Sequence, residues 1–169
     1  MPMRNRTTVP DRAKASGPTQ RDYSATIVAL KTTPDRERNE LVNAIVDADR
    51  RLRDSVRRFL SMLADALGEP FPADALASRS FDDLLTSLEQ HARAAGFGRI
   101  HELAQAIDEA RSAERQRNVI FSSASGDDTT ALSTAASMLE RLDAMFVGLC
   151  VEHVLEAHSR TALASAYLD

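Results

Sequence analysis

The sequence has few aromatic residues and a single cysteine, and these shortages narrow the class of protein. Aromatic residues make up 5% of the chain and tryptophan is absent, whereas alanine and leucine are abundant, a composition that favours helices. The lone Cys150 excludes an intramolecular disulfide. Because Cys150 lies in an apolar stretch, we interpret it as a small buried side chain in a reducing compartment.

The sequence also has no long hydrophobic run. No apolar stretch approaches the roughly 18 residues that a membrane span needs, and the N-terminus lacks the hydrophobic segment of a secretory signal. These absences predict a cytoplasmic protein that does not enter a membrane. The net charge of −4 at pH 7 argues against binding nucleic acid through overall charge, although a local basic patch could still bind it.

Residues 1–22 differ in composition from the rest of the chain. They contain three prolines and five basic residues against two acidic ones, with almost nothing apolar to bury, which predicts a disordered basic tail. Residues 23–169 then form a single helical domain, of the usual domain size. Residues 23–30, the only β-branched apolar run, predict either a short strand or an extended segment docked on the bundle.

Capping and breaking residues predict the limits of the first two helices. Thr33 and Pro34 form a start signal, and Gly68 ends a first helix of about 34 residues, roughly 50 Å long. Its apolar residues recur at spacings of three, four or seven: Leu41, Ile45, Leu52, Val56, Phe59, Leu63 and Leu67. Ser80 starts a second helix that ends at Gly96.

The remaining sequence predicts two further helices and hence the fold. The third begins near Gly98 and stops in the polar segment 122–128, and Asp127 or Asp128 caps the fourth, which continues towards Leu168. Four amphipathic helices with short connections predict an antiparallel four-helix bundle with long first and last helices.

The histidines do not have metal-ligand spacing. His91, His101, His153 and His158 form no i, i+3 or i, i+4 pair, the spacing by which one helix presents two ligands to a metal. We therefore expect neither a metal site nor a cofactor, and interpret these side chains as solvated or interfacial.

Arginines crowd two turns of the first helix. Arg50, Arg53 and Arg57 lie along one side of it and could contact the phosphates of RNA. The alternative is ion pairing one turn away on a solvated face, with the acidic residues Asp47, Asp49 and Asp54.

The end of the third helix carries a motif, Arg117-Asn118-Val119-Ile120-Phe121-Ser122-Ser123. It resembles the signature of HEPN proteins, small helical bundles in which an arginine, often followed by asparagine, precedes a histidine by four to six residues. Many members are metal-independent ribonucleases of toxin and phage-defence systems. The resemblance extends over residues 41–155 in the order and length of the helices.

The resemblance implies candidate site residues, Arg117, Asn118 and Ser122. In the family, histidine exchanges protons beside an arginine that stabilises phosphorane charge, usually across a dimer. Here Ser122 occupies the histidine position, and a serine hydroxyl without an adjacent base exchanges no proton near pH 7. His153 or His158 could reach Arg117 only through folding or dimerisation. Alternatively, Arg117 and Asn118 only satisfy helix-terminal carbonyls and the next cap.

These features lead to a hypothesis with two rivals. The leading hypothesis is a non-catalytic, homodimeric HEPN-like interaction module that binds a protein partner in a phage, defence or toxin–antitoxin setting. The rivals are a ribonuclease toxin that uses Arg117, and an RNA-binding protein that uses the arginines of the first helix.

Overall fold

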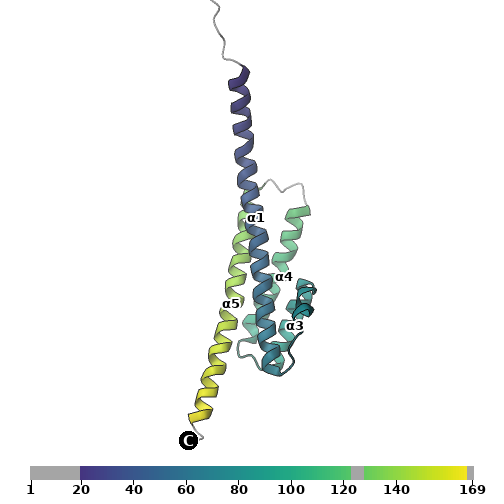
Figure 1. Cartoon of the computed structure of the whole chain (residues 1–169), viewed down its shortest axis with the longest axis vertical. Helices are drawn as coiled ribbons and strands as arrows, with labels where there is room; N and C mark the ends of the chain where they lie inside the picture. Colours follow the sequence, from purple (N-terminus) through teal and green to yellow (C-terminus); the bar gives the residue numbers. More distant parts are fainter. Residues whose placement is uncertain (1–19, 123–127, 167–169) are drawn as a thin grey trace, which may run out of the picture. The chain divides into compact units, whose positions relative to one another are not determined.

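The computed structural model describes residues 20–122 and 128–166. Within these residues the chain forms five helices and no strand: α1 (Gln20–Leu67), α2 (Ala73–Ala77), α3 (Phe81–Ala94), α4 (Ile100–Ser122) and α5 (Thr129–Ala166). Figure 1 shows α3, α4 and α5 beside the C-terminal half of α1. The predicted all-α class is confirmed.

The chain divides into two units, residues 1–36 and residues 37–169. The described part of the first unit, residues 20–36, is the beginning of α1. The prediction of a strand or an extended segment over residues 23–30 is therefore wrong. Each β-branched residue lowers helix stability by no more than about 0.7 kcal/mol, and no glycine interrupts α1, so the helix continues through this run.

The predicted start of the first helix at Thr33 and Pro34 is also wrong. Pro34 lies inside α1, where its ring removes one N–H donor from the helix. Of the predicted tail, residues 20–22 are helical, and residues 1–19 lie outside the described part of the chain.

The other predicted helix limits are confirmed, and each has a local cause. Gly68, with a φ of 75°, follows the last residue of α1, a backbone conformation that glycine adopts without strain. Ser80 Oγ accepts a hydrogen bond from the Asp83 amide at 3.1 Å and caps α3. Asp128 Oδ1 accepts from the amides of Thr130 and Ala131, at 3.0 and 3.1 Å, and caps α5.

A single apolar core lies among α1, α3, α4 and α5. Most of the predicted stripe of α1 contributes to it, with Leu52, Val56 and Phe59 fully buried. The largest side chains that the other helices bury are Leu84, Leu85, Leu88, Leu103, Ile107, Leu132 and Phe146. Phe59 and Phe97 meet edge to face, with ring centroids 5.6 Å apart.

The helices do not alternate in direction throughout, which departs from the predicted antiparallel bundle. Contacts between α4 and α5 join Arg99 to Glu152 and Glu109 to Arg141, so these helices run in opposite directions. Contacts between α1 and α5 join Arg51 to Glu140, Ser55 to Asp143 and Met62 to Cys150, so these two run in the same direction.

The connection after α1 explains this departure. Residues 68–80 include α2 and return the chain along α1 before α3 begins. The Arg53 guanidinium lies 4.6 Å from the centroid of the Phe81 ring, so α3 starts beside the middle of α1. The sequence suggested a short connection here, and a short one would have forced neighbouring helices to alternate.

No described helix contains a segment that is both long and apolar enough to cross a membrane.

Candidate functional site

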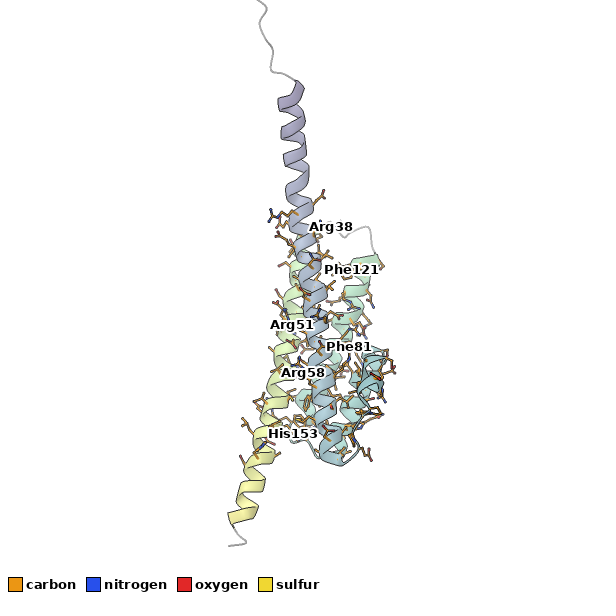
Figure 2. The ribbon with its side chains drawn as sticks, viewed as in Figure 1. Arg38, Arg51, Arg58, Phe81, Phe121 and His153 are labelled. Carbon is orange, nitrogen blue, oxygen red and sulfur yellow. The ribbon has the colours of Figure 1, made fainter. Side chains whose placement is uncertain are left out.

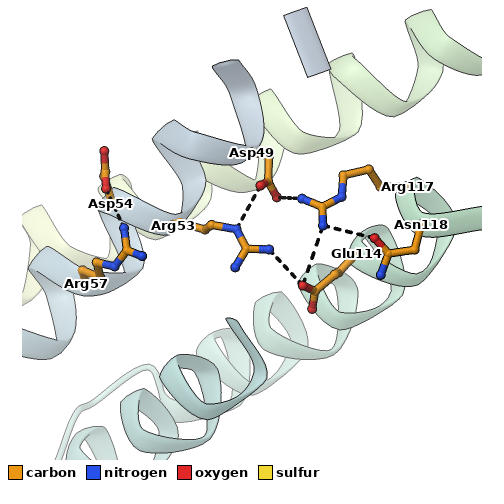
Figure 3. A network of polar contacts seen from close by, with 7 residues as sticks. All are labelled: Asp49, Arg53, Asp54, Arg57, Glu114, Arg117 and Asn118. Atoms are coloured by element: carbon orange, nitrogen blue, oxygen red, sulfur yellow. Dashed lines mark hydrogen bonds and ion pairs between the residues drawn. The ribbon is translucent and has the colours of Figure 1, made fainter. Parts of the chain in front are cut away.

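The motif arginine at the end of α4 lies against α1. Arg117 Nη1 is 2.5 Å from Asp49 Oδ1, and the two side chains are only 18% and 15% exposed. Arg117 Nη2 donates a hydrogen bond to Asn118 Oδ1 at 3.1 Å and lies 3.9 Å from Glu114 Oε1. Figure 3 shows the guanidinium between these oxygens. Two helices distant in sequence are therefore joined through this one side chain.

A second arginine completes the cluster. Arg53 Nε donates to Asp49 Oδ2 and Arg53 Nη2 donates to Glu114 Oε1, both at 2.9 Å. The same guanidinium packs over the Phe81 ring, a cation–π contact. Two arginines therefore share two carboxylates, and the four charges cancel. We call Asp49, Arg53, Glu114 and Arg117 the charge cluster.

The two carboxylate oxygens of Asp49 have different partners in the charge cluster. Asp49 Oδ2 receives an aligned hydrogen bond from Arg53, whereas Asp49 Oδ1 is buried without an aligned donor among the described residues. The Arg117 guanidinium is close to Oδ1 but does not meet it at a hydrogen-bonding angle, so their contact is an ion pair. Arg117 thus supplies the charge that compensates a buried carboxylate oxygen.

The structure gives the contacts of the residues implied by the motif. Arg117 is engaged by carboxylates, and the exposed Ser122 donates its hydroxyl to the Val119 carbonyl at 3.2 Å. Among the described residues the Arg117 guanidinium contacts Asp49 and Glu114, and the alternative that Arg117 and Asn118 satisfy helix-terminal carbonyls and the next cap stays a prediction, since residues 123–127 lie outside the described part of the chain.

The described histidines lie away from Arg117. His153 packs against Phe97, which in turn contacts Phe59 of α1, whereas Arg117 contacts Asp49. Ten residues separate these two positions on α1, which is about 15 Å of helix. In Figure 2, Phe121, a near neighbour of Arg117, lies towards one end of the α4–α5 pair, and His153 lies towards the other end. Within the described chain, no histidine is placed to exchange a proton beside Arg117.

The three arginines predicted to contact RNA differ in their contacts. Arg53 belongs to the charge cluster, and Arg57 donates to Asp54 Oδ1 at 2.9 Å and to the Leu76 carbonyl at 3.3 Å. The alternative prediction of ion pairs one turn away is confirmed for both residues. Arg50 is exposed and has no ion pair among the described residues, so one of the three remains available for a phosphate.

A groove opens beside the motif, between the end of α4 and the beginning of α5. It has a volume of about 540 Å³ and a mostly apolar lining. The lining includes Val119 and Ile120 from α4, and Ala131, Ala135 and Met138 from α5. Val119 is 63% exposed and its neighbour Phe121 is 47% exposed. The sequence analysis did not predict this groove. Its only signal in the sequence is the run of apolar residues after Arg117.

The remaining candidates give no reactive site. Cys150 is partly buried rather than fully buried, and its thiol donates to Met62 Sδ at 3.8 Å. Burial raises the pKa of Cys150 above its ordinary value, with a smaller opposing effect from Arg58, so the reactive thiolate is disfavoured. Among the described residues, no group of three or more histidine, cysteine or acidic side chains could hold a metal ion.

No protein-family model, curated protein or solved structure matches this chain.

Proposed function

We propose that this chain is a non-catalytic, HEPN-like interaction module of the cytoplasm that binds a protein partner in a phage, defence or toxin–antitoxin setting. The observation that carries the proposal is the engagement of Arg117 by Asp49 and Glu114. A guanidinium neutralised by carboxylates is a poor ligand for the phosphate that a ribonuclease must hold, since the phosphate must displace both.

The lack of a histidine beside Arg117 among the described residues supports the same proposal. Ser122 occupies the position of the family histidine and donates to a backbone carbonyl. Cleavage of RNA without metal needs a group that takes a proton from the attacking hydroxyl. In the described chain, the motif end of α4 offers no histidine for this step, and the two carboxylates beside Arg117, those of Asp49 and Glu114, are held in ion pairs with arginines.

The groove beside the motif supports binding of a protein. Its exposed edge carries Val119, and its wall includes Met138. An amphipathic helix docks in such grooves through apolar residues one turn apart. Methionine suits this surface because its flexible side chain adapts to the partner. A helical segment of another protein is therefore the occupant that we propose.

The first experiment tests the non-catalytic part. The purified protein is incubated with labelled single-stranded RNA and with tRNA, without divalent metal, beside an Arg117→Ala variant. We expect intact RNA in every reaction. Cleavage by the wild type that Arg117→Ala abolishes would overturn the proposal and favour the ribonuclease.

The second experiment tests the groove. The tagged protein is purified from its source cells beside Val119→Glu, which charges the groove edge, and beside Val46→Glu, a matched change at a valine of α1 that is 55% exposed. We expect one partner to be retained by the wild type and Val46→Glu and lost by Val119→Glu. That partner is then purified and bound in isolation. Equal retention by all three proteins would contradict a role for the groove.

A further inference from the structure

The groove beside the motif carries a positive charge at its rim. Arg115 lines the groove and is exposed to solvent. The other two arginines of α4 have carboxylate partners, since Arg111 pairs with Asp82 and Arg117 pairs with Asp49. Arg115 has no ion pair among the described residues, so its charge is not balanced within the described part of the chain.

The position of Arg115 around α4 separates it from the charge cluster. Glu114 and Arg117 point towards α1, where they contact Arg53 and Asp49. Each residue of a helix advances by about 100° around its axis, so Arg115 is about 100° from Glu114 and about 200° from Arg117. Its side chain therefore leaves α4 on another face and does not share the two carboxylates of the charge cluster.

The position of Arg115 along α4 separates it from α3. Asp82, in the first turn of α3, binds Arg111. From there α3 runs towards the beginning of α4, because α3 ends at Ala94 and a short turn leads to Ile100. Arg115 lies one turn beyond Arg111 in the opposite direction. It is therefore past the beginning of α3, and the acidic residues of that helix are out of its reach.

The groove lining contains one opposing charge, at a distance from Arg115. Because α4 and α5 run in opposite directions and Glu109 meets Arg141, Arg115 lies at the level of Ala135. Asp128 lines the groove about two turns away, or about 10 Å along α5. Its carboxylate is bonded to the first amides of α5. The middle of the groove is therefore positive at its rim and apolar in its floor.

We propose that the helix that binds in this groove is acidic: it carries a glutamate or aspartate, one turn from its apolar anchors, that pairs with Arg115. The inference rests on the proposed function, because it names the chemistry of the partner for the same groove. The apolar lining, which includes Val119 and Met138, receives the anchors. The guanidinium of Arg115 offers a planar pair of donors that matches a carboxylate.

Charge selects among helices of equal apolar character. A lysine or arginine on the occupant would bring a like charge to Arg115, and a neutral residue would leave the guanidinium unbalanced. Because Arg115 is exposed, its pair with a carboxylate stays in contact with water, and such pairs are weak. We therefore expect the acidic residue to raise affinity by about threefold to fivefold, which decides specificity rather than binding itself.

The chain contains no tryptophan, so a tryptophan in a peptide reports binding to the full-length protein directly. The probe is a synthetic amphipathic peptide of about 18 residues. One tryptophan and two leucines, spaced one turn apart, form its apolar face, and glutamates lie one turn from these anchors. Two matched peptides carry glutamine or lysine in place of the glutamates. Tryptophan emission should shift to shorter wavelengths when the ring enters the groove.

The wild type should bind the glutamate peptide about threefold or more tightly than the glutamine peptide, and the lysine peptide most weakly. Arg115→Gln should remove this order and Arg115→Glu should reverse it. Arg50→Gln is the matched control, because Arg50 is exposed and has no ion pair among the described residues, and it should keep the wild-type order. In about 1 M salt the three affinities should converge, since salt screens a pair at the surface.

A groove variant distinguishes failure of this inference from failure of the docking site. Val119→Asn makes the groove edge polar without adding charge, and it should weaken binding of all three peptides by a similar factor. If all three peptides bind the wild type equally and Val119→Asn weakens them, the groove stands and the acidic partner is wrong. Preference for the lysine peptide, or an order that Arg115→Gln leaves unchanged, would also overturn the inference. If no peptide binds, the inference and the docking groove fail together.

Discussion

Arg117 of α4 and Asp49 of α1 form a largely buried ion pair, in which the guanidinium supplies the charge beside a carboxylate oxygen that has no aligned hydrogen-bond donor. A residue that the motif resemblance suggests for catalysis thus compensates a buried carboxylate in this chain. Five predictions follow from this pair and from the other contacts of the helices.

Removal of Arg117 should destabilise the fold. Arg117→Ala leaves Asp49 with a poorly compensated charge, so the free energy of unfolding should fall by about 1–2 kcal/mol. Urea denaturation measures this change. The matched control is Arg115→Ala, because Arg115 is an exposed arginine of the same helix and its loss should cost less than about 0.5 kcal/mol. An equal loss in both variants would contradict a structural role for Arg117.

One hydrogen bond between α1 and α5 comes from a buried hydroxyl. Ser55 is 9% exposed, and its Oγ donates to Asp143 Oδ1 at 2.6 Å. Ser55→Ala should lower the free energy of unfolding by about 1–2 kcal/mol, since a charge-assisted hydrogen bond is lost. Ser61→Ala, at a partly exposed serine of the same helix, is the control for chemical denaturation. A stability equal to that of the wild type would show that water replaces the hydroxyl.

The beginning of α3 depends on its cap. Ser80→Ala removes the oxygen that accepts from the Asp83 amide, and should cost about 1 kcal/mol in thermal or chemical denaturation. Ser80→Thr retains a hydroxyl that can accept from the Asp83 amide and donate to the Asp83 carboxylate, and should restore most of that stability. Failure of threonine to rescue would contradict a capping role for the hydroxyl.

Arg141 should make stability depend on pH through Glu109. Arg141 Nη2 donates to the Glu109 carboxylate at 2.7 Å and Gln105 adds a bond at 3.1 Å, and these contacts lower the pKa of Glu109. A lowered folded-state pKa gives stability that is present above the unfolded value of about 4.3. That stability is lost as the pH falls through the folded value.

Arg141→Met should therefore lower the free energy of unfolding at pH 7 by no more than about 0.5 kcal/mol, because the pair is near the surface. The difference from the wild type should disappear at an acid pH below the lowered folded-state pKa of Glu109. Urea denaturation at both pH values checks this expectation. A difference that persists in acid would point to lost packing of the arginine stem instead.

Cys150 should react slowly in the folded protein. Burial raises the pKa of its thiol, so less thiolate is present at pH 8 than in the unfolded chain. Reaction with Ellman's reagent should be at least about tenfold faster in denaturing urea than in buffer. Equal rates would show that the groove lined by Arg58, Val147 and Val151 exposes the sulfur fully.

Local signals in the sequence determined most helix limits. Gly68 ends α1 because its positive φ breaks the helix, and Ser80 and Asp128 begin helices because their side chains bond free amides. These effects act within one turn and are therefore readable in sequence. The run 23–30 was predicted wrongly because its β-branched residues weaken a helix only slightly, and the helix of its neighbours extends through it.

The sequence by itself determined the all-α class, the stripe of α1 and the pairing of Arg53 and Arg57 with acids one turn away, because these follow from helical periodicity alone. Only the tertiary structure decided that α1 and α5 run in the same direction and that Arg117 meets Asp49. It also placed the groove beside Val119 and left Val147, Val151 and Leu155 of α5 exposed. These features depend on which helices become neighbours. The connection between α1 and α3 and the shared core decide which helices meet, and neither can be read from a single segment of the sequence.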